Sequence, residues 1–185
     1  MVRQDAEHLF EQMHPGFFER PYIKNMGEGA RYDEQVLFLK EYDGDYAPAR
    51  TDGIRFGFFG EGDVEKLKQS VALVDETWVQ YFGKTDAVYC AFEGDTVVSF
   101  CLVDDMGEHE LAGQKVKIAG PGCVGTVPAY RKRGIGLDMV QNATKILKDR
   151  GYDLSYIHYT AVGHWYAKLG YETILAWGKD GFVKE

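Results

Sequence analysis

The spacing of apolar residues switches along the chain between the helical period and the strand period. Helical spacing predicts a helix over 5–13 with Asp5 as N-cap, a helix capped by Asp63, and a helix that follows Arg133 and ends at Gly151. Two shorter helices are expected, one carrying Trp78, Tyr81 and Phe82, the other over 162–169 and stopped by Gly170. Strand-like runs cover 34–42, 54–59, 87–105 with a hairpin turn at 93–95, 115–127, 154–159 and 171–177.

This order of elements predicts a mixed α/β fold. The segment 43–53 is rich in Asp, Gly and Pro, which is typical of a loop or a boundary, and we expect a second, polar loop over 104–114. We therefore divide the chain into an N-terminal extension, 1–50, packed on the core, and a domain, 51–185. No chemistry can be assigned to the extension from its sequence.

Composition limits the possible functions. The chain has 185 residues, of which 45% are apolar and 14% aromatic, so a sizeable core is expected and disorder is not. The formal net charge of -8 argues against a protein that grips nucleic acid or an anionic membrane through its whole surface. Any anion site must therefore be local.

The remaining global features indicate a soluble, cytoplasmic protein. The three cysteines, Cys90, Cys101 and Cys123, are widely spaced in apolar contexts and form neither a disulfide framework nor a metal pattern. No apolar run approaches the roughly 20 residues of a membrane span, and the first residues lack the apolar centre of a signal peptide. We expect no metal and no membrane or nucleic-acid partner, and a monomer or a homodimer.

One stretch contradicts ordinary helix electrostatics. In "YRKRGIG", residues 130–136, three cations precede a helix whose N-terminus already carries roughly half a positive charge from its aligned peptide dipoles. A bound anion would remove the conflict, because the free N–H groups, the dipole and the cations would all attract it, and glycines would let it approach the backbone. The alternative is a solvated basic turn, in which each misplaced charge costs only a few tenths of a kcal/mol.

The glycine spacing selects among phosphate-binding loops. A third glycine for a dinucleotide fingerprint is missing, and so is the Gly-Lys-Ser or Gly-Lys-Thr of a Walker A loop. What remains is "TVPAYRKRGIG", a strand end followed by Pro and then Arg-x-x-Gly-x-Gly at a helix start. This resembles the coenzyme A pyrophosphate loop of the GNAT acetyltransferase superfamily.

A second stretch strengthens the resemblance. "AVGHWYAKLGYETI" is similar to the C-terminal motif of that family, a short helix with a Tyr followed by x-Lys-Leu-Gly-aromatic at the start of a strand. The resemblance covers roughly 51–185. It implies the GNAT fold, with a central, mostly antiparallel sheet flanked by helices, and acetyl-CoA as cosubstrate.

The resemblance also implies roles for individual residues. The strand before the loop would pair with the pantetheine arm, and the N–H of Val124 would act as an oxyanion donor at the thioester carbonyl. Lys132 or Arg133 could instead reach the 3′-phosphate. The cofactor-binding residues implied in this way are Val124, Thr126, Val127, Arg131, Lys132, Arg133, Gly134, Ile135, Gly136 and Leu137.

Tyr166 takes the family position of the general acid that protonates the departing thiolate; its phenol stays protonated at neutral pH. A tyrosine that only packs in the core or on the pantetheine is the alternative. No general base is assigned. Some members place a Glu where this chain has Gly120, and the frequent Asn near the final short helix is replaced around Tyr159 and Thr160. Candidate bases are Asp104, Asp105, Glu108, Glu110, His158 or a water chain, although His158 could equally face a neighbouring strand.

The resemblance implies an acetyl-CoA-dependent N-acetyltransferase that acts on a primary amine of a small molecule or peptide by direct attack in a ternary complex. The acidic segments "YDGDY", 42–46, and "VDDMGEHE", 103–110, favour a cationic acceptor, which they could attract, although a solvated surface explains them equally well. The alternatives are a non-catalytic acyl-CoA-binding or sensor module, and a phosphate-binding regulatory domain unrelated to coenzyme A, which would leave the second motif unexplained.

Overall fold

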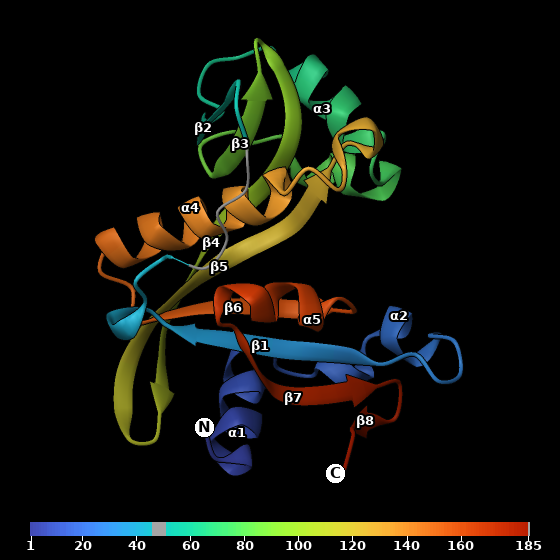
Figure 1. Ribbon diagram of the computed structural model, residues 1–185. Coiled ribbons are helices and arrows are strands. Elements are labelled where there is room, and N and C mark those ends of the chain that lie inside the picture. The colour runs from blue at the N-terminus through green and yellow to red at the C-terminus, as the bar shows by residue number, and fades with distance from the viewer. Residues whose placement is uncertain (46–50, 185) are drawn as a thin grey trace.

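In the computed structural model, which describes residues 1–45 and 51–184, eight strands form one sheet in the order β2-β3-β4-β5-β6-β1-β7-β8 (Figure 1). All neighbouring pairs are antiparallel except β5 and β6. The predicted mixed α/β fold with a mostly antiparallel sheet is confirmed. The strands are β1 (Tyr32–Phe38), β2 (Ile54–Phe58), β3 (Val88–Glu93), β4 (Thr96–Leu111), β5 (Gln114–Thr126), β6 (Leu154–Thr160), β7 (Glu172–Gly178) and β8 (Gly181–Phe182).

Helices cover both faces of this sheet (Figure 1). On one face, α4 packs through Met139, Ala143 and Leu147 against buried residues of the sheet and of the segment after β6. On the opposite face, α3 packs on β3 and β4, and α1 packs on β1, β5, β6 and β7. The α-helices are α1 (Arg3–Met13), α2 (Pro21–Lys24), α3 (Val64–Ala72), α4 (Ile135–Asp149) and α5 (Gly163–Tyr166); the 3-10 turns are η1 (Phe17–Glu19), η2 (Leu39–Glu41), η3 (Glu76–Tyr81), η4 (Pro128–Tyr130) and η5 (Ala167–Leu169). Within the described ranges, no helix has the length and apolar character needed to cross a bilayer.

Strand β1 comes from the segment that we predicted to be an extension. It lies inside the sheet, hydrogen-bonded to β6 on one side and to β7 on the other. The first part of the chain therefore contributes a strand to the sheet as well as a helix to its surface. The boundary that we predicted at residue 50 falls in 46–50, outside the described residues, and the division into 1–50 and 51–185 stays a prediction.

Strands β5 and β6 touch over a short length and then diverge. Their parallel register consists of Ile118 opposite Leu154 and Ala119 opposite Ser155. Beyond this point the two ribbons separate, and α5 follows the end of β6 beside the widening gap between them (Figure 1). Gly120 marks the last close approach, because a Cβ atom there would lie 1.8 Å from the carbonyl oxygen of Tyr156.

The prediction of a polar loop over 104–114 is wrong. β4 continues to Leu111 and β5 begins at Gln114, so the two strands form one long hairpin that turns at Ala112 and Gly113, both with positive φ. The sequence looks like a loop because this part of the hairpin is largely exposed on both faces. Opposite charges face each other across it, Glu108 with Lys117 and Glu110 with Lys115, which favours the pairing.

Two helix and strand limits in the N-terminal part also differ from prediction. Asp5 is not an N-cap: α1 begins at Arg3, and Asp5 lies in its first turn, where a carboxylate still suits the helix dipole. The strand predicted to reach Tyr42 ends at Phe38 and passes into η2. The sequence analysis also missed the two-residue strand β8.

The local signals were reliable elsewhere. The Asp63 side chain accepts hydrogen bonds from the backbone N–H groups of Glu65 and Lys66 and caps α3 as predicted. The hairpin turns at Gly94, which has φ 57°. α4 lies where the spacing of apolar residues predicts a helix, and Gly151 (φ 79°) follows its end.

Candidate active site

The strand that precedes the cationic stretch contains a β-bulge. Leu102 pairs with Gly122 and Phe100 with Gly125, so Cys123 and Val124 together face Cys101. Cys123 has φ 45°, which is unusual for a residue with a side chain. A bulge disturbs the ladder locally and re-aims backbone groups, and it does so here at the residue predicted to donate its N–H to the oxyanion.

Residues 130–136, which we call the cationic loop, lead from η4 into α4. Gly134 occupies the N-cap position with φ 81°, a left-handed conformation that suits glycine. It provides no side-chain cap. The N–H groups of Leu137 and Asp138 bond to the carbonyl oxygen of Gly134, whereas those of Ile135 and Gly136 have no acceptor within the described part of the chain. The helix start therefore carries free donors, which is the geometry that binds an anion.

The three cations of the loop are all exposed but differ in their contacts. The Nε of Arg131 donates to the carbonyl oxygen of Thr126 at 3.0 Å, which ties the loop to the end of β5. Arg133 lies over the ring of Tyr130 and forms an exposed ion pair with Glu93 at 3.3 Å. Lys132, with φ 63°, has no side-chain partner among the described residues.

Gly136 joins the helix to the strand. A Cβ atom there would lie 2.6 Å from the hydroxyl oxygen of Thr126 and 3.5 Å from the ring of Trp165. The Cα of Gly136 thus faces protein atoms and not a ligand, so this glycine serves close packing of α4 on β5, while its N–H stays free at the helix start. The Thr126 hydroxyl is held in turn by Ser99, whose hydroxyl lies 2.9 Å away and donates to the carbonyl oxygen of Gly125.

The other residues predicted to bind the cofactor surround this contact. Val127 is buried and its N–H bonds to the carbonyl oxygen of Val98. Ile135 packs in a small cluster with Ala91 and Val98, and Leu137 and Val124 are half-buried against the core under α4.

Tyr166 ends α5 and is 6% exposed. Its ring packs edge-on against Trp165 at a centroid distance of 4.8 Å, and its hydroxyl has no hydrogen-bond partner in the described ranges. Burial, followed by the charges of Tyr171, Cys101 and Cys123, raises the pKa of Tyr166 well above its ordinary value near 10. The phenol therefore stays protonated at neutral pH.

Tyr171, five residues further on, is a buried tyrosine with a structural role. Its hydroxyl lies 2.6 Å from that of Ser155 and 2.9 Å from that of Thr144, so it links β6 to α4. Burial raises the pKa of Tyr171 to about 12, against the opposing effect of these two hydrogen bonds. Tyr166 is buried like Tyr171, but its hydroxyl has no such hydrogen bonds among the described residues.

A second charged region lies on the other face of the sheet. Glu34 is fully buried and accepts hydrogen bonds from Nδ1 of His158 at 2.9 Å, from the indole N–H of Trp177 at 2.6 Å and from the N–H of Tyr159 at 3.2 Å. We call these four residues the Glu34 cluster. His158 therefore faces its neighbouring strand, the reading that the sequence analysis left open.

The imidazole of His14 stacks on this cluster, 3.9 Å from the ring of His158. His14, Glu34 and His158 offer possible metal ligands within 4.8 Å of one another. However, the two imidazole planes are only 17° apart, which directs their in-plane lone pairs side by side instead of toward one point. Glu34 is also already engaged by three donors. We therefore assign no metal to these residues, and the absence of a metal cofactor stays a prediction.

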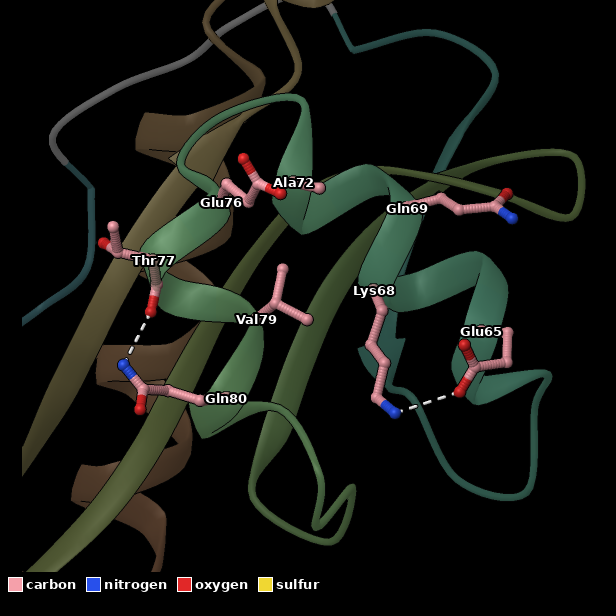
Figure 2. A pocket seen from close by; sticks show the side chains of 8 residues that line it. All are labelled: Glu65, Lys68, Gln69, Ala72, Glu76, Thr77, Val79 and Gln80. Carbon is pink, nitrogen blue, oxygen red and sulfur yellow. Dashed lines mark hydrogen bonds and ion pairs between the residues drawn. The ribbon is translucent and has the colours of Figure 1, made fainter.

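A pocket of about 610 Å³ lies beside α3 and η3 (Figure 2). Lys68 pairs with Glu65 at 2.9 Å, and the side-chain amide of Gln80 donates to the carbonyl oxygen of Thr77. These polar groups satisfy one another, and none of the predicted site residues lines the pocket. We do not assign it a role.

The structure brings the predicted residues into one region, from the bulge on β5 through the cationic loop to Tyr166. Sequence reasoning missed two residues of this region. Ser99 holds the hydroxyl of Thr126, and Trp165 approaches Gly136 and packs against Tyr166. Ser99 could have been found as the polar residue inside the apolar strand "TVVSFCLV". Tyr159 and Thr160 make other contacts. The Tyr159 ring packs against Tyr32 and Trp177. The Thr160 hydroxyl accepts a hydrogen bond from the N–H of Val162.

Comparison with known sequences identifies one family. The sequence model of the acetyltransferase (GNAT) domain matches residues 63–174, more than half of the chain. The match includes the bulge, the cationic loop, α4 and Tyr166. A search of curated proteins finds no significant match.

Solved structures with the same architecture come from several organisms. A GCN5-related glucosamine N-acetyltransferase region of a fungal multi-domain GH3 β-N-acetylglucosaminidase has a TM-score of 0.66 and 20% identity, over 79% of this chain and 20% of that one. A GCN5-related N-acetyltransferase from Kribbella flavida has a TM-score of 0.55 and 17% identity, over 90% and 63%. A transcriptional regulator from Bacillus halodurans has a TM-score of 0.52 and 20% identity, over 64% and 93%.

The chain thus spans a fifth of the fungal enzyme and less than two thirds of the Kribbella protein. At these identities the likeness establishes a shared fold, and it leaves the substrate open.

Proposed function

Because the chain belongs to the GNAT acetyltransferase family, we propose that it transfers the acetyl group of acetyl-CoA to a primary amine of a small molecule or peptide, by direct attack in a ternary complex. The observation that carries this proposal is the start of α4. There, an uncapped helix N-terminus with free N–H groups at Ile135 and Gly136 lies beside the exposed cations of the cationic loop. A pyrophosphate would satisfy donors that the protein leaves open.

In this proposal the cosubstrate runs from the cationic loop toward the bulge. The main-chain N–H groups of residues 134–136 and the side chain of Lys132 bind the phosphates, and the pantetheine arm lies along β5 where β6 has diverged from it. The N–H of Val124 points at the thioester carbonyl oxygen and stabilises the negative charge that develops there during attack. Arg131 positions the loop instead of binding phosphate, since it already bonds to Thr126.

Tyr166 completes the reaction as the proton donor to the departing sulfur. Its raised pKa keeps the proton in place, but it also makes full transfer to a thiolate unfavourable, since the conjugate thiol has a pKa of about 8.5. We infer that the phenol acts mainly as a hydrogen-bond donor to the developing thiolate. Its contribution then lies near the lower end of the usual range, about 100-fold.

Binding is tested first. Acetyl-CoA and CoA should raise the melting temperature by mass action, and NAD or ATP should do so much less. A thiol-release screen over primary amines then detects transfer. Equal shifts with all nucleotides, or none with CoA, would remove the proposal, whereas CoA binding without transfer to any amine would favour an acyl-CoA-binding module.

Tyr166→Phe tests the acid. We expect kcat to fall about 100-fold with little change in the affinity for acetyl-CoA and in stability, because the lost hydroxyl has no partner. Tyr171→Phe is the matched control: it loses hydrogen bonds to Ser155 and Thr144, so it should cost about 1–3 kcal/mol of stability and leave kcat nearly intact. The raised pKa of Tyr166 also predicts no fall in rate from its ionisation up to pH 10. A loss confined to affinity would show that Tyr166 only packs on the cosubstrate.

A further inference from the structure

The proposed reaction needs a group that takes a proton from the acceptor. A primary amine with a pKa near 10.4 is almost fully protonated at pH 7, and freeing its lone pair costs about 4.6 kcal/mol. A base near the thioester carbon would perform this step inside the site. The following inference rests on the proposed function.

The position that the family resemblance offers for a base is closed. A side chain at Gly120 would begin 1.8 Å from the carbonyl oxygen of Tyr156 on β6, so no carboxylate can occupy that position in this backbone. Another residue near the bulge must provide the base.

Asp104 on β4 lies directly across the sheet from Gly120. Its Oδ2 is 3.5 Å from the point where a Cβ atom of Gly122 would lie, which places the carboxylate beside the residue that precedes the bulge. Asp104 is exposed, and no hydrogen bond or ion pair holds its carboxylate among the residues that the structure describes. An acceptor could therefore reach it.

The other candidate bases are engaged or lie elsewhere. Asp105 accepts a hydrogen bond from the N–H of Gly107 at 2.8 Å, and His158 belongs to the Glu34 cluster. Glu108 and Glu110 lie further along the exposed hairpin, opposite Lys117 and Lys115.

We propose that Asp104 is the general base of this protein, and that it works at the bulge together with Tyr166. The carboxylate takes one proton from the acceptor ammonium, directly or through one water. The freed nitrogen lone pair forms the bond to the thioester carbon. When the carbon–sulfur bond breaks, the sulfur keeps the electron pair, and the Tyr166 hydroxyl donates a hydrogen bond to the developing thiolate. The nitrogen then loses its second proton, which the thiolate takes up, and Asp104 releases the first proton to solvent in each turnover.

The electrostatics of the bulge agree with this pairing. Although the Asp104 side chain is largely exposed, partial desolvation raises its pKa above the ordinary value, which makes it a stronger base than a fully solvated carboxylate. Burial, then the negative charges of Asp104 and Asp75, raises the pKa of Cys123 to about 11. Asp75 is itself engaged by the N–H and hydroxyl of Thr77 and is not available as a base.

The test compares Asp104→Asn with Glu108→Gln, a matched loss of one charge on the same strand. Wild type is first assayed by thiol release with acetyl-CoA and a panel of a polyamine, an amino sugar and a lysine-containing peptide. With the best acceptor, Asp104→Asn should lower kcat/KM at pH 7 by at least about 100-fold and leave the affinity for acetyl-CoA within about twofold. Glu108→Gln should change neither.

The pH profile distinguishes a base from a structural residue. As the pH approaches 10, the acceptor loses its own proton, so the deficit of Asp104→Asn should shrink, which a packing defect would not do. An Asp104→Asn variant with the wild-type rate and profile would overturn the role of Asp104 while leaving the proposed function intact. A wild type that binds acetyl-CoA but acetylates no amine would instead overturn the proposed function, and the role of Asp104 with it.

Discussion

The cationic loop and the Glu34 cluster both place charge where elementary electrostatics disfavours it, and they resolve the problem in opposite ways. The Glu34 cluster surrounds a fully buried carboxylate with three donors from the protein itself. The cationic loop leaves the first N–H groups of α4 without acceptors and keeps its cations at the surface. When the fold satisfies a buried charge internally, removal of one partner destabilises the protein. Charge and donors that the fold leaves open are available to a ligand.

The largest effect is expected from Glu34→Ala. The substitution leaves His158, the indole N–H of Trp177 and the N–H of Tyr159 without an acceptor in the interior, which should cost about 3–5 kcal/mol of unfolding free energy. Denaturant unfolding measures this loss, with Glu93→Ala as control, since that exposed carboxylate pairs with Arg133 and Tyr130 near the surface and its removal should cost no more than about 1 kcal/mol.

If Glu34→Ala does not fold, Glu34→Gln is used instead. It keeps the side-chain volume and one carbonyl acceptor, so its loss of unfolding free energy should be smaller. Folded variants of Glu34 should bind acetyl-CoA with wild-type affinity. A marked loss of affinity would show that the Glu34 cluster and the cationic loop are coupled.

Gly134→Glu should act on the cationic loop alone. It places a carboxylate against the proposed pyrophosphate, and such like-charge contacts cost several kcal/mol, so the affinity for CoA should fall at least about 100-fold. Titration calorimetry measures this loss. Gly134→Ala is the matched control, because both variants bear the roughly 1–2 kcal/mol strain of a left-handed residue at φ 81° and only one adds charge. Equal losses in both would show that strain, and not an anion site, explains the effect.

A smaller effect is expected from acid. Burial, followed by the charges of His158, Arg20 and His109, lowers the pKa of His14 from 6.5 to about 3. As the pH falls through 6.5, the unfolded chain takes up a proton that the folded protein cannot bind until about pH 3. The stabilisation is thus complete above pH 6.5 and declines below it.

Between pH 7 and pH 5 this loss should amount to about 1–2 kcal/mol. His14→Phe retains a stacked ring and should remove most of the decline, whereas His8→Gln, an exposed histidine on the same helix, should not change it. Unfolding free energies measured at several pH values test this. A decline of the same size in His14→Phe would assign it to other groups.

The sequence by itself determined the features that depend on near neighbours. The cap at Asp63, the turn at Gly94 and the helix after Gly134 follow from local periodicity, and the cationic loop was visible as a conflict between side-chain charge and helix dipole. The tertiary structure decided what depends on distant partners. His158 lies 124 positions from Glu34 and Trp177 lies 143 from it, so no local pattern could reveal that cluster. The same holds for the place of β1 between β6 and β7, and for the contact of Gly120 with Tyr156 that excludes a base at this position and draws attention to Asp104. Capping and periodicity act over a few residues, whereas burial and strand pairing are set when the whole sheet assembles.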